Sequence, residues 1–333
     1  MAKIRIGLIG YGSWTRNAYL PALKLDTRAD IISAAASSED TRQLIRNELG
    51  SDINVYDGIE RLLNGQEIDA VMIAVPDSIH EHTLSAALNS NVAVFYEPPV
   101  TDTRQRLLPM LSCLLASNQI TFADLELGFI PAVTRASELV QTDTIGKIQT
   151  ASIRLQSGWG PVPNYNLCNF NHLCTWYVDV LNRILDASPR RVLLLDGYGT
   201  PGRRQNHSIG HLDYDGVWGT LQANIASVGE LEITVEINGD AGDLYINILN
   251  GEIRFRSRLN SNWTIEHLPA LTPYADWPGM HESISTFLDA VEKGHSTINN
   301  ALAMTELQLV GLAAEESRDS GTWAEVKDIN TLV

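Results

Sequence analysis

The sequence predicts an α/β fold of two domains, a parallel doubly wound sheet followed by an α+β domain built on a large, mostly antiparallel open sheet. The first observation is a repeated alternation of buried strands and helices over residues 1–123. The second is a series of short strands with Asn-Gly turns after residue 190. The third is the length of 333 residues, more than one hydrophobic core usually supports. We expect the domains to be 1–123 and 124–333.

The first domain is predicted from short apolar runs, each followed by a helical pattern. The continuous apolar run within 67–76 is typical of a strand buried on both faces. The expected strands are 3–9, 31–36, 67–76 and 92–96. One expected helix begins after Gly12 and ends near residue 25. Two more cover 41–49 and 79–90. Repeated units of this spacing favour a parallel sheet.

The second domain is predicted from helices at its two ends and strands between them. The expected helices are 131–141, 170–185, 281–293 and 299–318. The expected strands are 148–156, 191–196, 216–223, 231–237, 243–249 and 252–257. Residues 197–215 are expected to form a glycine-containing loop. An alternative for the C-terminal helices, 281–318, is that they pack back on the first domain.

Composition narrows the class of partner. The formal net charge of −16 argues against nucleic acid and anionic membranes. We find no signal-peptide pattern and no apolar run of about 18 residues, so we expect a cytoplasmic protein that acts on a small molecule. Cys168, His172 and Cys174 lack an evident fourth ligand, so we expect no metal.

The turn after the first strand predicts a dinucleotide site. Gly10 permits a tight turn, and Gly12 lets backbone N–H groups approach a pyrophosphate at a helix N-terminus. Ser13 and Trp14 follow, and Thr15 replaces the third glycine of the usual fingerprint. The alternative is a tight strand–helix turn that binds no ligand.

The residues at the end of the second expected strand indicate whether the cofactor's adenosine ribose carries a 2′-hydroxyl or a 2′-phosphate. Sites that prefer NAD usually have an acid there, but this chain has Ser37 and Ser38, with Arg42 one turn into the next helix. Two hydroxyls and an arginine favour the 2′-phosphate of NADP, with NAD as the alternative. The other interpretation is that Ser37 only caps the helix.

Several segments together resemble the Gfo/Idh/MocA oxidoreductase family: "GLIGYGSWTRNAYLPALK", "IDAVMIAVPDSIHEHTLSAAL", "YEPP", "IGKIQTASIRL" and the C-terminal "TFLDAVEKG". The resemblance implies an N-terminal Rossmann domain that binds NAD(P) and a C-terminal domain that carries substrate. Its open sheet often forms the oligomer contact, so we expect a homodimer or homotetramer. Val75, Pro76 and His80 match the loop that flanks the cofactor, and Glu97 matches the acid of a Glu-Lys-Pro motif.

The departures from that family concern its catalytic residues. The lysine of the Glu-Lys-Pro motif falls at Pro98, and an Asp-x-x-x-His pair on a helix falls at His172 and Trp176. Neither Pro98 nor Trp176 can accept a proton from a substrate hydroxyl. Oxidation of an alcohol by the family's usual route should therefore fail.

The changed motif is also similar to that of biliverdin reductases, which deliver hydride to a conjugated carbon. We therefore expect a reductase of a conjugated C=C or C=N bond. His172 is the first candidate for the proton donor, because an imidazole titrates near neutrality. If His172 does not donate the proton, Tyr96 or Tyr165 is the next candidate. An equally strong alternative is that His172 is a hydrogen-bonded core residue.

Substrate contacts are expected from Trp176, from Glu126 within "DLELG", and from Arg203 and Arg204 in the 197–215 loop, which suit a carboxylate or phosphate. Trp176 as core and the arginines as a solvated loop are the alternatives. Two other functions remain open. One is a non-catalytic nucleotide-binding sensor, and the other is a sugar or polyol dehydrogenase whose catalytic residues are shifted.

Overall fold

The computed structural model describes residues 3–65, 67–159, 167–197, 207–269, 277 and 279–331. They divide into two compact units. Unit 1 comprises Met1–Leu125 with Thr272–Thr305, and unit 2 comprises Glu126–Leu271 with Glu306–Val333. This division differs from the expected single boundary after residue 123, because α8 (Met280–Lys293) packs against the first helices of unit 1.

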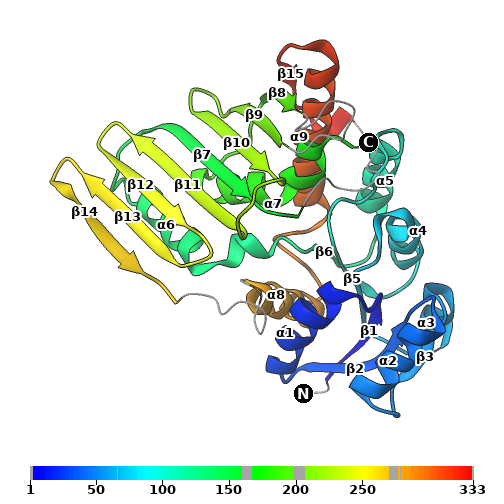
Figure 1. Ribbon diagram of the computed structural model, residues 1–333. Helices are drawn as coiled ribbons and strands as arrows, with labels where there is room; N and C mark the ends of the chain where they lie inside the picture. Colours follow the sequence, from blue (N-terminus) through cyan, green and yellow to red (C-terminus); the bar gives the residue numbers. More distant parts are fainter. Residues whose placement is uncertain are drawn as a thin grey trace. The chain divides into compact units, whose positions relative to one another are not determined.

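Unit 1 contains a six-stranded sheet in the order β3-β2-β1-β4-β5-β6, and every neighbouring pair is parallel. Its strands are β1 (Ile4–Ile9), β2 (Ala29–Ala35), β3 (Asn54–Tyr56), β4 (Ala70–Ile73), β5 (Ala93–Tyr96) and β6 (Thr121–Ala123). The strand order reverses between β1 and β4 (Figure 1), which is the switch point where such sheets bind ligands. The expected Rossmann fold is confirmed.

The helices of unit 1 connect these strands. They are the π-helix η1 (Thr15–Tyr19), α1 (Leu20–Leu25), α2 (Glu39–Leu49), α3 (Ile59–Gly65), α4 (Asp77–Leu88), α5 (Arg104–Ala116) and α8. The ring of Phe287 in α8 packs at a tilt against the rings of Phe95 and Phe122, at centroid distances of 5.3 and 5.9 Å. Arg28 also binds α8, through Asp289 at 2.5 Å. Aromatic packing and an ion pair thus tie this late helix to the first unit.

Unit 2 contains a nine-stranded sheet in the order β14-β13-β12-β11-β7-β10-β9-β8-β15, with one parallel pair, β7 and β10. Its strands are β7 (Ile148–Gln156), β8 (Arg191–Gly197), β9 (His207–Asp213), β10 (Trp218–Asn224), β11 (Glu232–Gly239), β12 (Gly242–Asn247), β13 (Glu252–Ser257), β14 (Asn260–His267) and β15 (Ala324–Glu325). The predicted large, mostly antiparallel sheet is confirmed.

Helices pack on one face of this sheet. Unit 2 includes η2 (Glu126–Phe129), α6 (Pro131–Gln141), α7 (Asn169–Leu185), η3 (Ile329–Thr331) and, from residue 306, most of α9 (Ala301–Ser320). α6 contacts β12 and β13, while α7 contacts β7, β9 and β10 (Figure 1). The buried side chains at alternate positions of β7, Ala151, Ile153 and Leu155, supply the sheet's half of this core.

The structure corrects two expected elements. Residues 207–213 form β9 rather than the end of a loop, because Ser208, Gly210 and Leu212 alternate toward the core between two histidines. Because most of these inward residues are small or polar, the sequence does not show the apolar alternation typical of a strand. The apolar run within 67–76 forms a strand only at Ala70–Ile73, since the chain leaves the sheet toward Pro76.

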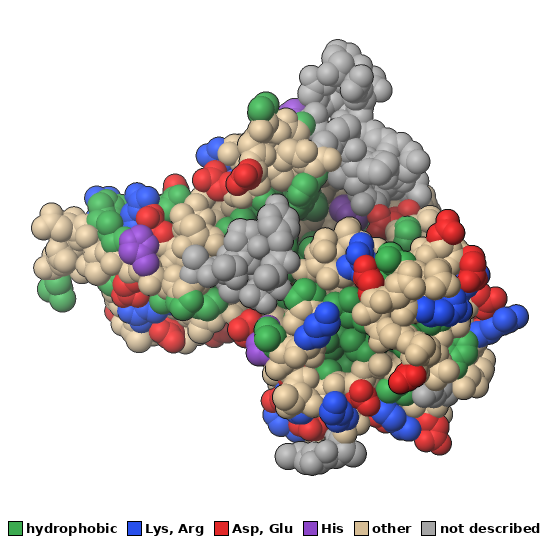
Figure 2. Space-filling model, turned by 60° about the horizontal axis from the view of Figure 1, so that its bottom comes forward, with side chains coloured by type: hydrophobic (Ala, Val, Ile, Leu, Met, Phe, Trp, Pro, Cys, Tyr) green, Lys and Arg blue, Asp and Glu red, His purple; other side chains and the backbone are tan. Residues whose placement is uncertain are grey.

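Charged side chains of both signs are mixed on the described surface. Figure 2 shows one face of the molecule, where Lys and Arg side chains lie among Asp and Glu without a broad basic area over the described residues. Among those residues, no helix is long and apolar enough to cross a membrane.

Candidate functional site

The glycine turn after β1 has the geometry that a phosphate loop requires. Gly10 has φ of +87°, and a Cβ built on it would lie 2.0 Å from the carbonyl oxygen of Ala74. Any other residue would therefore clash with the chain that follows β4. A Cβ on Gly12 would meet no atom within 4 Å, so the backbone of Gly12 faces open space.

The helix after this turn begins tightly. Thr15 donates its hydroxyl to the Gly10 carbonyl at 3.1 Å, and the Arg16 N–H donates to the Gly12 carbonyl at 3.1 Å. The first N–H groups of a helix, here those near Ser13 and Trp14, lack helical partners and favour an anion. Open space beside Gly12 and these N–H groups together fit a pyrophosphate. Thr15 fills the third glycine position by closing the turn with its own hydrogen bond.

The edge of β2 is organised by Ser38 and Arg42. The Ser38 hydroxyl accepts from the Thr41 N–H at 3.1 Å, so Ser38, rather than Ser37, caps α2. Arg42 donates to the carbonyl oxygens of Ala36 and Ser37 at 2.8 and 2.7 Å. Arg42 therefore holds the turn in which the predicted ribose contacts lie, and its guanidinium remains at that edge.

The residues after β4 lie next to the glycine turn. Val75 is one of the nearest neighbours of the Gly10 position, and Pro76 precedes α4 as its N-cap. His80, one turn into α4, is buried, and its Nε2 has no hydrogen-bond partner among the described residues. Burial lowers the pKa of His80 to about 4, so its imidazole is neutral near pH 7.

Glu97, directly after β5, is at the centre of a hydrogen-bond network. Its Oε1 accepts from the indole N–H of Trp14 and from the hydroxyl of Tyr19. Asp124, which follows β6, donates its backbone N–H to the Tyr96 carbonyl at 2.8 Å, so it lies on the strand end next to the one that carries Glu97. Trp14 packs the edge of its ring on Trp277, at a centroid distance of 4.9 Å. The pyrophosphate loop is thus joined directly to the Glu-Pro-Pro segment.

Two features of this network concern charge. Asp124 is fully buried and accepts from the Ser283 hydroxyl at 3.2 Å. In the described part of the chain, the side chains that donate to the Glu97 carboxyl group are an indole and a phenol, neither of which is a cation. Burial raises the pKa of Glu97 to about 7. Pro98, where the family has a lysine, is buried and is joined to Pro99 by a cis peptide bond.

Tyr96, an alternative proton donor, is less suited to that role in the structure. Its side chain is fully buried, and its hydroxyl has no hydrogen-bond partner within the described ranges. Burial raises the pKa of Tyr96 above its usual range, so the phenol releases its proton less readily. Tyr165, the other alternative, lies outside the described residues, as do Arg203 and Arg204.

The remaining predicted residues lie in unit 2, on or beside α7. His172 is 9% exposed, and Trp176, one turn later on the same helix, is partly exposed. Glu126 is buried in η2, which contacts α7, and its charge raises the pKa of Tyr177 together with burial. The cysteine flanking α7 is structural, because the Cys168 sulfur caps the helix by accepting from the Asn171 N–H at 3.3 Å. Among the described residues, no His, Cys, Asp or Glu group could hold a metal ion.

A buried polar cluster at the start of α7 was not expected. Glu315 of α9 accepts from the Cys168 N–H at 2.6 Å and from Asn171 at 3.3 Å, and it pairs with Arg318 at 2.8 Å. Asp196, at the end of β8, interacts electrostatically with both Glu315 and Arg318, and burial raises its pKa to about 6. The sequence "EESRD" looks like an exposed helical face, so only the register of α9 could have revealed that Glu315 is inside.

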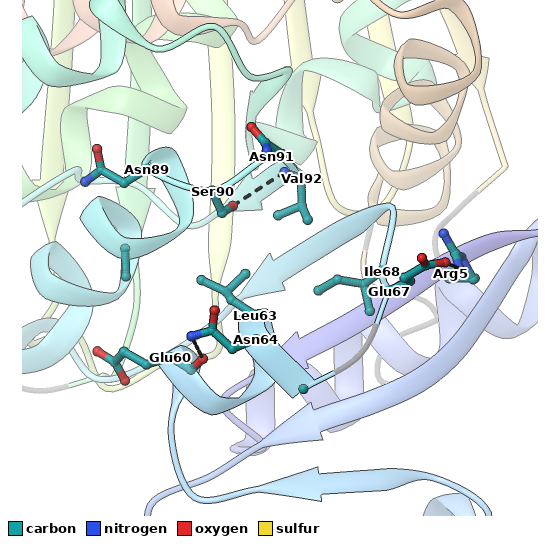
Figure 3. Close-up of a pocket in the computed structure, with 12 residues that line it drawn as sticks. Arg5, Glu60, Leu63, Asn64, Glu67, Ile68, Asn89, Ser90, Asn91 and Val92 are labelled. Carbon is teal, nitrogen blue, oxygen red and sulfur yellow. Dashed lines mark hydrogen bonds and ion pairs between the residues drawn. The ribbon is translucent and has the colours of Figure 1, made fainter.

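A separate depression lies at the other end of the unit 1 sheet. Its volume is about 940 Å³, and Figure 3 shows Arg5, Leu63, Ile68 and Val92 around it. Arg5, Ile68 and Val92 lie at the amino ends of β1, β4 and β5, and Leu63 lies in α3. Ligands of such sheets bind outside the carboxyl ends of the strands. Arg5 is engaged by Glu67 at 3.0 Å and by Asp69. The depression is therefore distinct from the glycine turn.

Two substitutions separate folding from cofactor binding at the turn. Gly12→Ala places a methyl group in open space, so we expect an unchanged melting temperature. It also obstructs close approach of a pyrophosphate, so affinity for the dinucleotide should fall at least about tenfold. Gly10→Ala should lower both the melting temperature and the affinity for the dinucleotide, because the methyl group clashes with the carbonyl oxygen of Ala74. Thermal denaturation and fluorescence titration measure the two effects, and normal binding by Gly12→Ala would contradict the assigned loop.

Comparison with known proteins agrees with this geometry. Residues 4–122 match the model of the Gfo/Idh/MocA family, described as "Oxidoreductase family, NAD-binding Rossmann fold". The chain is 23% identical over 150 residues to the dTDP-3,4-didehydro-2,6-dideoxy-alpha-D-glucose 3-reductase of Streptomyces antibioticus, covering 45% of each chain. The chain spans less than half the length of the curated relatives that it matches.

Solved structures show the fold of the whole chain. A levoglucosan dehydrogenase in complex with NADH and levoglucosan superposes with a TM-score of 0.87 and 17% identity, covering 98% of this chain and 100% of that one. An oxidoreductase domain protein from Kribbella flavida superposes with a TM-score of 0.85 and 18% identity. The match covers 98% of this chain and 100% of that one. The family match confirms the expected class of cofactor, a nicotinamide dinucleotide. Residues 4–122 therefore match the NAD-binding domain of the Gfo/Idh/MocA oxidoreductase family, as the sequence motifs predicted.

Proposed function

We propose that the protein is an NAD(P)-dependent reductase that delivers hydride to a conjugated C=C or C=N bond. The observation that carries this proposal is the Glu97 network, in which a carboxyl group without a cation stands where the family has a carboxylate beside a lysine. A site of this kind cannot strip a proton from an alcohol. Reduction of an electron-poor double bond needs no such base.

The cofactor is proposed to be NADP, with NAD as the alternative. The residues directly after β2, Ala36, Ser37 and Ser38, include no acid. With Arg42 they lie at the edge where the 2′-phosphate of NADP would lie. The carbonyl contacts of Arg42 use one of its two terminal nitrogens, while the other pairs with Glu39 at 2.8 Å. Binding of a 2′-phosphate would compete with Glu39 for this nitrogen. The structurally similar levoglucosan dehydrogenase, solved in complex with NADH, supports NAD as the alternative.

The substrate is proposed to be held by unit 2. His172 supplies the proton, and Trp176 and Glu126 contact the substrate, as do Arg203 and Arg204 in the 197–215 segment. The position of His172 on α7, with a partly exposed Trp176 one turn away, supports this assignment. An imidazole N–H can donate a proton to the reduced substrate.

Two other functions have specific support. Names of several relatives, such as the 3-reductase of Streptomyces antibioticus, favour a keto-sugar carbonyl as the acceptor. The replacement of the family's lysine and histidine equally favours a sensor that binds the nucleotide without turnover. The cytoplasmic location that the sequence predicts is also part of this proposal.

We also propose that the protein forms a homodimer or homotetramer through the outer face of the unit 2 sheet. In the described part of the chain, α6 and α7 contact one face of the sheet, and alternation places large apolar side chains on the other. These exposed residues are Leu195, Trp218, Trp263 and Ile265. Arg254 and Arg256 on the same face stack on Tyr245 and Trp263, which gives the face a flat, mixed character.

The reductase proposal is tested by binding and then by turnover. NADPH and NADH are titrated separately by nicotinamide fluorescence, and the tighter one is offered to acceptors with a conjugated C=C, a C=N or a keto-sugar carbonyl. His172→Asn should lower turnover about 10²- to 10⁴-fold with cofactor affinity unchanged. His211→Asn, on β9 of the same unit, is the matched control. Unchanged turnover in His172→Asn would remove this residue from the mechanism.

The assembly proposal is tested by mass. Sedimentation velocity should give two or four times the chain mass of 36.7 kDa. Trp263→Asp should shift the protein toward the monomer, because it places a charge in the apolar contact. A monomer in the wild type at micromolar concentration would contradict the proposal.

A further inference from the structure

We propose that Arg42 and Arg46 form an anion site for the 2′-phosphate of NADP, and that Glu39 occupies this site and so sets the preference between NADP and NAD. The inference deepens the proposed function and rests on it, because the anion is part of a bound dinucleotide. It adds Arg46 as a second ligand of the phosphate and makes Glu39 a specificity-determining residue.

The three side chains lie on one face of α2. Glu39 is the first residue of this helix, and Arg42 and Arg46 follow at intervals of three and four residues, so each lies about one turn after the previous one. One carboxylate oxygen of Glu39, Oε2, accepts from Nε and Nη2 of Arg42 at 3.0 and 2.8 Å. The other oxygen, Oε1, accepts from Nη1 of Arg46 at 3.3 Å. A negatively charged group therefore already lies between two guanidinium groups.

This cluster lies at the end of the sheet where the adenosine ribose of a dinucleotide binds. α2 begins shortly after β2, and the carboxyl end of the second strand of a Rossmann sheet contacts the ribose 2′-position. Nη1 of Arg42 donates to the carbonyl oxygens of Ala36 and Ser37 at 2.8 and 2.7 Å, so this guanidinium is fixed beside the turn. The N-terminus of α2 adds partial positive charge. A phosphate on the 2′-oxygen therefore competes with Glu39 for the same donors.

The Glu39 carboxylate is charged and exposed, so another anion can displace it. Its side chain is 66% exposed, whereas that of Arg42 is 16% exposed. The guanidinium of Arg42, and then that of Arg46, lower the pKa of Glu39, so its carboxylate is ionised near neutral pH. Ion pairs at such exposed positions contribute little to stability, because water and salt screen them. A phosphate carries more charge and more acceptor oxygens than a carboxylate and is the stronger ligand for two guanidinium groups.

The two cofactors differ in what they require of Glu39. NAD has a 2′-hydroxyl and leaves the contacts of Glu39 with the two arginines intact. NADP has to break these contacts before its phosphate can use the same donors, and the displaced carboxylate repels the phosphate while it stays nearby. Glu39 therefore makes the preference for NADP smaller than the two arginines alone would give.

The experiment measures the dissociation constants of NADPH and NADH by nicotinamide fluorescence in phosphate-free buffer. Glu39→Gln removes the charge and keeps the length of the side chain. It should raise the ratio of the NADH constant to the NADPH constant about tenfold, because each exposed ion pair that it releases contributes up to about fivefold. The change should come from tighter binding of NADPH, with NADH binding nearly unchanged.

A second variant tests the part of Arg46. When Arg46→Gln is added to Glu39→Gln, the affinity for NADPH should fall at least about threefold, because the released guanidinium no longer reaches the phosphate. The affinity for NADH should stay the same. Retention of the full gain in NADPH affinity would remove Arg46 from the site.

The matched control is Asp40→Asn. Asp40 is exposed, follows Glu39 in the first turn of α2, and has no side-chain hydrogen bond or ion pair with the described residues. The control removes the same charge from the same turn, so its ratio should stay within about twofold of the wild type.

The outcomes separate the inference from the proposed function. If the wild type binds a dinucleotide but Glu39→Gln leaves the ratio unchanged, or Asp40→Asn shifts it equally, the inference is overturned and the proposed function stands. If neither NADPH nor NADH binds the wild type, the proposed function fails and the inference fails with it. Melting temperatures of the variants should equal that of the wild type within a few degrees, because the pairs that they remove are exposed.

Discussion

The hydrogen bond from the Trp14 indole to the Glu97 carboxyl group connects the parts of unit 1 on which a cofactor site depends. Trp14 belongs to the turn that Gly10 makes possible, and Glu97 ends the strand two places from β1. Tyr19 reinforces the contact from the π-helix. On the neighbouring strand end, the carboxyl group of Asp124 accepts from Ser283 and so binds α8. Loop, sheet and late helix are thus held by two carboxyl groups at adjacent strand ends.

The absence of a cation beside this carboxyl explains the Glu-Pro-Pro segment in physical terms. A lysine at position 98 would neutralise Glu97 and favour its ionised form. Pro98 supplies no charge and no donor, so the Glu97 carboxyl group is bonded to neutral donors only, among the described residues, and burial raises its pKa to about 7. The substitution therefore changes the site from a base-assisted arrangement to a proton-holding one. That change is consistent with reduction rather than oxidation of an alcohol.

The sequence predicted the fold well where local pattern decides it. The bounds of α6, β7 and β13 fall at the expected residues, because hydrophobic period and turn residues agree there. It failed at β9, whose inward residues are small or polar, and at Ser38, where only backbone geometry distinguishes the cap from its neighbour. The partners of Glu97 could not be predicted, because Trp14, Tyr19 and Asp124 come together only through the order of the strands. Glu315 was hidden for a similar reason, in a polar run of α9 whose register alone shows it to be buried.

The most direct test of this account is the pKa of Glu97 in a Pro98→Lys variant, followed by the carbon-13 shift of its side-chain carboxyl in glutamate-labelled protein. The wild type should titrate near the value of about 7 that burial gives the pKa of Glu97. The added ammonium group should lower that pKa by about one unit or more, since an opposite charge favours the ionised form. A titration midpoint that is the same in both proteins would show that the missing cation does not govern the proton on Glu97.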